Sequence, residues 1–161
     1  MVDAVKLRGQ YRTAVMACLG VTAVPFLLSA VAFMLAASPD PGQPADDPVM
    51  LGIFGLLALS PLLTVAIVRR IARNSLARAA ESPIGVEGAL MIWSLTEYAL
   101  WEVSSLLGFV GFVLTGSVVF FATCIAFTLG GYAFSFPRWS RWEALLTDLG
   151  LVPYPGALTV G

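Results

Sequence analysis

Hydrophobic positions in this chain form four long, nearly uninterrupted stretches and do not alternate with polar ones. The stretches cover residues 13–37, 49–68, 89–114 and 118–136. Each is close to the ~20 residues with which an α-helix crosses a hydrocarbon core about 30 Å thick. Strands of outer-membrane barrels are about 10 residues long and alternate in hydrophobicity, so they fit poorly. The pattern predicts an all-α integral membrane protein, with four transmembrane helices in a single domain over residues 1–161.

The composition favours the same class of protein. Of the 161 residues, 58% are hydrophobic and 12% are charged, whereas a soluble domain has roughly 45–50% and about 25%. The net charge of −1 and the absence of His argue against nucleic-acid binding and remove the commonest metal ligand. We expect lipid as a partner, and no nucleic acid, metal or cofactor. Cys18 and Cys124 lie in apolar stretches and are predicted to be small buried side chains.

The basic residues predict how the chain is oriented. All nine Lys and Arg residues lie before the first stretch, between the second and third, or after the fourth: Lys6, Arg8, Arg12, Arg69, Arg70, Arg73, Arg78, Arg138 and Arg141. Because cytoplasmic segments carry the excess of positive charge, both termini are predicted to be cytoplasmic. The excess of Arg over Lys is typical of a GC-rich bacterial genome, which favours the inner (plasma) membrane.

The segments between the stretches differ in character. Residues 38–48 contain three Asp and four Pro and are predicted to form an acidic outer loop without secondary structure. Residues 69–88 are predicted to form a basic cytoplasmic connection, helical at first, with Ser82 and Pro83 starting the third helix as N-cap and first helical residue. The side chains expected to lie at the headgroups are Arg69, Arg70 and Arg73.

A cleaved signal peptide is the alternative for the first stretch. Basic residues precede this stretch, and small residues follow near Ala36 and Ala37. Its apolar part exceeds the roughly 7–15 residues of a signal h-region, so we favour an uncleaved transmembrane helix.

The C-terminal segment, 137–161, contains a short amphipathic helix by its pattern. One face carries Trp139, Trp142, Leu145, Leu146 and Leu149. We interpret it as an interfacial helix anchored in the inner headgroup layer by the two Trp residues. Docking onto a partner subunit is the alternative.

Small residues and prolines indicate where helices pack. Pro25 and Pro61 lie inside the first and second stretches, where each removes a backbone hydrogen bond and is predicted to kink its helix. Gly108 and Gly111 give the third stretch a face that allows close helix contact.

Two acidic residues interrupt the third stretch. Glu97 and Glu102 each cost about 2.5–3.5 kcal/mol near a helix centre, whereas an apolar residue returns only about 0.3–0.6 kcal/mol. The third helix should therefore insert poorly alone and lie inside the bundle. On a helix the two carboxylates point about 140° apart. Glu97 shares its side with Ser104, and Glu102 shares its side with Tyr98.

Glu97, Glu102, Tyr98 and Ser104 are therefore the candidate site. One hypothesis is a proton- or cation-handling pair or a polar contact to another subunit. The other is structural, with the carboxylates bound to polar groups of the bundle or reaching the cytoplasmic arginines.

Part of this region resembles the hairpin of rotary ATPase ring proteolipids. The resemblance rests on Ile71-Ala72-Arg73-Asn74 in the connection and Leu95-Thr96-Glu97 in the third stretch. It implies that a carboxylate on the second hairpin helix carries an ion. The chain departs from that family because it lacks the glycine-rich first helix, has a longer connection and has a second glutamate.

No nucleophile–base pair, phosphate-binding loop or cofactor motif is visible. We therefore expect a non-enzymatic membrane protein, an accessory or scaffold subunit of a larger complex or a homo-oligomer. The alternative is a small proton or cation transporter or channel that uses Glu97 and Glu102. A membrane-embedded enzyme is a third hypothesis, and it would need a catalytic set that the sequence does not arrange.

Overall fold

A computed structural model describes residues 4–37, 48–79 and 85–152, which fold into helices joined by short connections. The helices are α1 (Ala4–Ala36), α2 (Pro48–Ala79), α3 (Gly85–Thr115), α4 (Val118–Ser135) and α5 (Trp139–Asp148). Four of them, α1 to α4, are long and apolar enough to cross a membrane. The described residues thus confirm the predicted all-helical fold with four long apolar helices.

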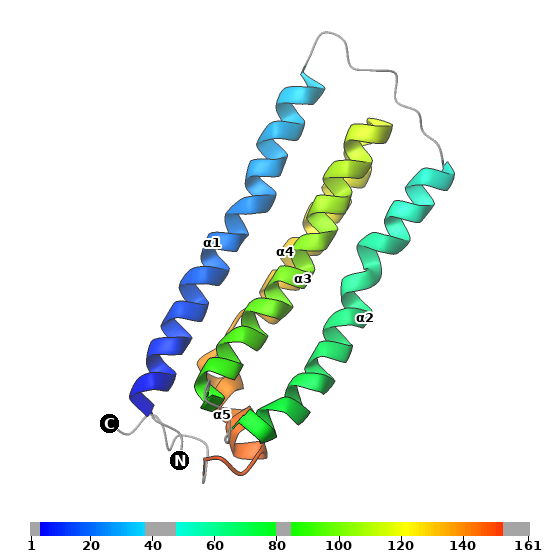
Figure 1. Cartoon of the computed structure of the whole chain (residues 1–161). Coiled ribbons are helices and arrows are strands. Elements are labelled where there is room, and N and C mark those ends of the chain that lie inside the picture. Colours follow the sequence, from blue (N-terminus) through cyan, green and yellow to red (C-terminus); the bar gives the residue numbers. More distant parts are fainter. Residues whose placement is uncertain (1–3, 38–47, 80–84, 153–161) are drawn as a thin grey trace.

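Helix α3 is the centre of the bundle. It packs against α1, α2 and α4, whereas α1 touches α4 only slightly. In Figure 1, α1 and α2 lie on opposite sides of the α3–α4 pair. Half of the most apolar window of α3 (50%) is buried, against 17% for α1 and for α2. The helix that carries two glutamates is therefore the one most surrounded by protein.

A tight turn joins α3 to α4. Gly116 adopts a left-handed conformation with φ of +69°, which a glycine adopts without steric cost. Its N–H donates to the Phe112 carbonyl at 2.7 Å. Ser117 then caps α4, because its side chain accepts from the Phe120 N–H at 3.4 Å. These two residues hold α3 and α4 antiparallel and adjacent.

Helix ends differ from the sequence-based boundaries. Helix α2 continues to Ala79, past the apolar stretch that ends at residue 68 and into the connection that the sequence predicts to be helical at first. Helix α1 begins at Ala4, ahead of the predicted residue 13. Hydropathy marks the width of a bilayer, but backbone hydrogen bonds extend a helix into polar sequence until a breaker intervenes. The predicted Ser82–Pro83 helix start and residues 38–47 of the outer loop lie outside the described residues, and Pro48 is the first residue of α2.

The two helix-interior prolines do not end their helices. Both are fully buried, and each helix is continuous through its proline. Ser29 donates to the Pro25 carbonyl at 2.7 Å. Pro25 and Pro61 therefore lie in the packed interior of the described bundle.

The apolar face of α5 contacts this chain itself, not the exterior. Trp142 is 1% exposed, and its Nε1 donates to Ser94 Oγ on α3 at 3.1 Å. The Trp139 ring is partly buried in the same cluster, edge-on to Tyr11 at 5.4 Å between centroids. The prediction that Trp142 anchors an interfacial helix is wrong. An amphipathic helix buries its apolar face on any apolar surface within its reach. Here that surface is formed by the ends of α1, α2 and α3, through Leu7, Leu76, Val86 and Leu90.

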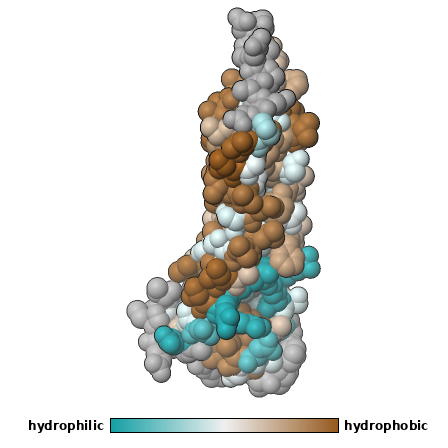
Figure 2. Space-filling model, turned by 90° about the vertical axis from the view of Figure 1, so that its right-hand side faces the viewer, coloured by the Kyte–Doolittle hydropathy of each residue, from teal (hydrophilic) through white to brown (hydrophobic). Residues whose placement is uncertain are grey.

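All nine Lys and Arg residues fall in the described parts of the chain and lie toward one end of the bundle. We call this the basic end. It comprises the start of α1, the second half of α2, the start of α3, and α5, which gather at the bottom of Figure 1. Figure 2 shows hydrophilic residues collected there below a largely hydrophobic body.

Candidate functional site

Glu97 lies at the centre of an ion-pair cluster at the basic end. It is 1% exposed and receives two hydrogen bonds from the Arg69 guanidinium, Nε to Oε1 at 2.7 Å and Nη2 to Oε2 at 2.9 Å. Arg141 approaches from α5, with Nη2 at 3.5 Å from Oε2. A planar guanidinium that meets both carboxylate oxygens is the strongest geometry for such a pair. We call Arg69, Glu97 and Arg141 the charged triad.

Polar and aromatic groups complete the surroundings of the triad. Ser135, the last residue of α4, accepts from Arg69 Nη2 at 3.4 Å and from Trp101 Nε1 at 2.7 Å. The Arg69 guanidinium also lies over the Phe134 ring at 4.6 Å, and that of Arg141 lies 5.4 Å from the Trp93 ring. The triad therefore connects α2, α3, α4 and α5 at one point.

The triad carries more positive than negative charge. Partial burial lowers the pKa of the Arg141 guanidinium below its ordinary value. The Glu97 carboxylate opposes this shift, whereas the Arg69 guanidinium adds to it. One carboxylate cannot neutralise two guanidinium groups. The surroundings of Arg141 thus favour a further anion.

Glu102 belongs to a different cluster, at a different level of α3. Its carboxylate accepts hydrogen bonds from the hydroxyl groups of Tyr132 on α4 and Ser105 on α3. The Tyr132 ring stacks on Tyr98 with centroids 4.1 Å apart and an interplanar angle of 4°. The Tyr98 hydroxyl shares a hydrogen bond with Thr22 of α1 at 2.8 Å. This polar chain joins α1, α3 and α4.

The structure therefore divides the sequence-predicted site. Glu97 joins arginines, Glu102 and Tyr98 join Tyr132, and Ser104 joins neither. Ser104 is fully buried and donates to the Ala58 carbonyl of α2 at 2.6 Å. Each predicted side chain holds α3 to a neighbouring helix.

The sequence predicted that Arg69 lies at the headgroups. The structural alternative had the carboxylates reaching the cytoplasmic arginines, without singling out Arg69 or Arg141. The structure turns the Arg69 guanidinium to Glu97, although 27% of the side chain stays exposed. One signal was available, because Arg69 and Glu97 are equally distant in sequence from Pro83, so an antiparallel hairpin centred there would bring them to one level. No comparable signal points to Arg141, which reaches Glu97 only because α5 folds back.

Glycines allow the close packing of α3 on α4. A Cβ on Gly108 would overlap Cys124, one on Gly111 would overlap the Phe120 ring, and one on Gly131 would overlap the Trp101 ring. Gly108, Gly111 and Gly131 therefore lie where α3 and α4 approach each other closely.

Cys18 and Cys124 are buried and unpaired. Within the described ranges, no group of three or more His, Cys, Asp or Glu residues could hold a metal ion. The chemistry of the described site is therefore ionic pairing and hydrogen bonding.

Comparison with known proteins gives no relative on which to base a function. No protein-family model matches the chain, and no curated protein or solved structure matches it significantly.

Proposed function

We propose that this chain is a non-enzymatic, multi-pass protein of the bacterial inner membrane, an accessory or scaffold subunit that assembles with other membrane proteins or with itself. The observation that carries this proposal is that both carboxylates of the third helix are bound to other side chains of the bundle. Glu97 pairs with Arg69 and Arg141, and Glu102 accepts hydrogen bonds from Tyr132 and Ser105. Carboxylates with such partners fix helix positions and are costly to release.

The outer surface supports the same proposal. Large apolar side chains of α1 and α2 face outward, with Phe33 76%, Leu56 74% and Leu63 74% exposed. Such a surface suits lipid and other transmembrane helices. Because only a small part of α1 and α2 is buried against the rest of the bundle, these two helices expose the most apolar surface for contact with a second protein.

The orientation we propose has both termini in the cytoplasm, since the basic end would then lie on the side where Lys and Arg accumulate. A membrane-impermeant thiol reagent tests this in intact cells. A cysteine at position 43 should react from outside, whereas Ser75→Cys should react only after permeabilisation. The reverse pattern would refute the orientation.

The subunit role is tested by extraction in mild detergent, followed by size-exclusion chromatography and mass spectrometry. We expect a stoichiometric partner or a defined oligomer, and crosslinking in native membranes should capture the same species. A chain that is monomeric by both measurements would contradict the proposal.

The alternative, proton or cation transport through the carboxylates, has its own readout. In reconstituted vesicles, Glu97→Gln and Glu102→Gln would abolish ion flux in a transporter that still folds. Our proposal expects no flux above empty vesicles for the wild-type chain.

A further inference from the structure

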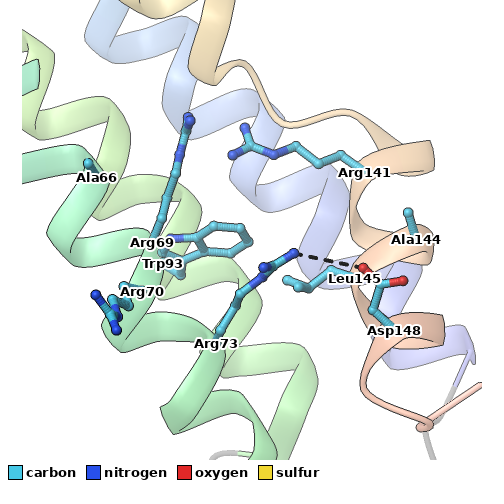
Figure 3. Close-up of a pocket in the computed structure, with 9 residues that line it drawn as sticks. All are labelled: Ala66, Arg69, Arg70, Arg73, Trp93, Arg141, Ala144, Leu145 and Asp148. Atoms are coloured by element: carbon cyan, nitrogen blue, oxygen red, sulfur yellow. Dashed lines mark ion pairs between the residues drawn. The ribbon is translucent and has the colours of Figure 1, made fainter.

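A pocket lined by four arginines opens at the basic end. It has a volume of about 450 Å³ and lies between α2 and α5, with Trp93 of α3 on its wall. Figure 3 shows Arg69, Arg70 and Arg73 on α2 and Arg141, Leu145 and Asp148 on α5. The guanidinium groups of Arg69 and Arg141 lie at one end of the pocket, whereas Arg70 lies at its edge with its guanidinium group directed away from them.

The acidic residues nearby do not balance these arginines. Glu97 forms ion pairs with both Arg69 and Arg141. Asp148 lies 3.8 Å from Arg73, and both side chains are about two-thirds exposed (67% and 66%), so this pair is weak. No acidic side chain in the described part of the chain forms an ion pair with Arg70. Four guanidinium groups thus face two carboxylates, and the pocket has an excess of two positive charges.

An apolar groove begins where this pocket ends. It has a volume of about 630 Å³ and runs between α2 and α4, along Leu62, Val65, Phe127, Gly130 and Phe134. The groove exists because α2 and α4 both pack on α3 and make few backbone contacts with each other. A Cβ on Gly130 would meet nothing within 4 Å, so the groove has open space at this position of α4.

Arg69 lies where the arginine pocket and the apolar groove meet. It lines the arginine pocket and the apolar groove, and also a third cleft of about 430 Å³ with Arg138, Ser140 and Arg141. One continuous surface therefore offers several cationic donors at the basic end and an apolar channel leading away from it. This distribution is complementary to a phospholipid that has an anionic headgroup and apolar acyl chains.

We propose that this surface is a binding site for an anionic phospholipid, with its phosphate between Arg73 and Arg141, further positive charge from Arg70 at the edge of the pocket, and an acyl chain in the groove between α2 and α4. The inference goes beyond the subunit role, and it rests on the membrane placement proposed above. Basic pockets between transmembrane helices on the cytoplasmic side bind anionic headgroups in this way. The bound lipid offsets the positive charge that Glu97 and Asp148 leave uncompensated.

The test is lipid binding to the purified full chain in a neutral detergent, measured by native mass spectrometry with a fluorescence titration. The probes are dioleoylphosphatidylglycerol, dioleoylphosphatidylcholine and inorganic phosphate. We expect the anionic lipid to bind about tenfold or more tightly than the zwitterionic one, and to lose this preference as salt is raised. Equal binding of the two lipids would overturn the proposal, and phosphate binding as tight as the anionic lipid would identify a free anion as the ligand.

Substitutions test the arginine pocket and the apolar groove separately. Arg70→Gln with Arg73→Gln should remove most of the preference for the anionic lipid. Both side chains are exposed and outside the charged triad, so the fold should persist, as circular dichroism can verify. Arg12→Gln with Arg78→Gln is the matched control, because it removes the same charge from exposed positions outside the pocket. Equal weakening by both pairs would show general attraction to the basic end and refute the site.

Gly130→Leu tests the groove. A larger side chain there should weaken binding of a long-chain lipid several-fold, whereas a short-chain phosphatidylglycerol should be affected less. No difference between the two lipids would refute the placement of the acyl chain. None of these measurements needs a partner protein, so a failure of the subunit role and a failure of the lipid site are distinguishable.

Discussion

The guanidinium of Arg69 meets both carboxylate oxygens of Glu97, at 2.7 and 2.9 Å, across the interface of α2 and α3. The buried Glu97 carboxylate would be costly without a partner, because removing an isolated ion from water costs several kcal/mol. Together the two side chains form a hydrogen-bonded unit that fixes the level at which the two helices meet. A slip of either helix would leave one charge without its partner.

Glu97→Gln should destabilise the protein. The substitution keeps the size of the side chain but leaves Arg69 and Arg141 without their shared counter-charge. We expect a loss of about 1–3 kcal/mol in the free energy of unfolding, below the cost of a fully buried pair because both arginines keep some solvent. Unfolding by a denaturing detergent, followed by circular dichroism, measures it. An unchanged or raised stability would contradict the structural role of the triad.

The two arginines of the triad should differ in importance. Arg69→Met removes two short hydrogen bonds to Glu97, whereas Arg141→Met removes a contact of 3.5 Å from a guanidinium that burial already disfavours. We expect Arg69→Met to cost at least about 1 kcal/mol more than Arg141→Met. Combined with Glu97→Gln, Arg69→Met should add less than its single effect. Equal single effects, or full additivity, would count against the pairing.

Gly131→Ala should weaken the α3–α4 contact. The new methyl group would overlap the Trp101 ring, and overpacking of this kind costs about 1–3 kcal/mol. Gly130→Ala is the matched control on the same helix, since its methyl group meets open space. We expect the control to be neutral or slightly stabilising. Thermal unfolding of the two variants side by side makes the comparison, and equal losses would contradict the observed packing.

Trp142→Ala should release α5. The indole is buried among the ends of the long helices and bonded to Ser94, so its removal should cost about 3–5 kcal/mol of local or global stability. Limited trypsin digestion of the purified chain at Arg138 and Arg141 reports the release. Trp139→Ala, a partly buried neighbour, should accelerate cleavage less. Cleavage of the wild type at the variant's rate would show that α5 is not docked.

The sequence by itself determined the number of long helices and which of them is central. Their number follows from the four uninterrupted apolar stretches, and the burial of α3 follows from the cost of exposing Glu97 and Glu102 to lipid. It also determined that one end would be basic, because every Lys and Arg lies beside the same ends of the helices. Each of these properties depends on local composition or periodicity.

Only the tertiary structure decided what the polar groups contact. The sequence placed the Trp142 face at the headgroups, and the structure buries it on Leu7, Leu76 and Leu90, because an amphipathic face does not encode which apolar surface will cover it. The packing of α5 against the ends of the long helices also brings Arg141 to Glu97 and forms the arginine pocket between α2 and α5. Contacts between residues far apart in the chain depend on how helices pack, and that is a property of the whole bundle.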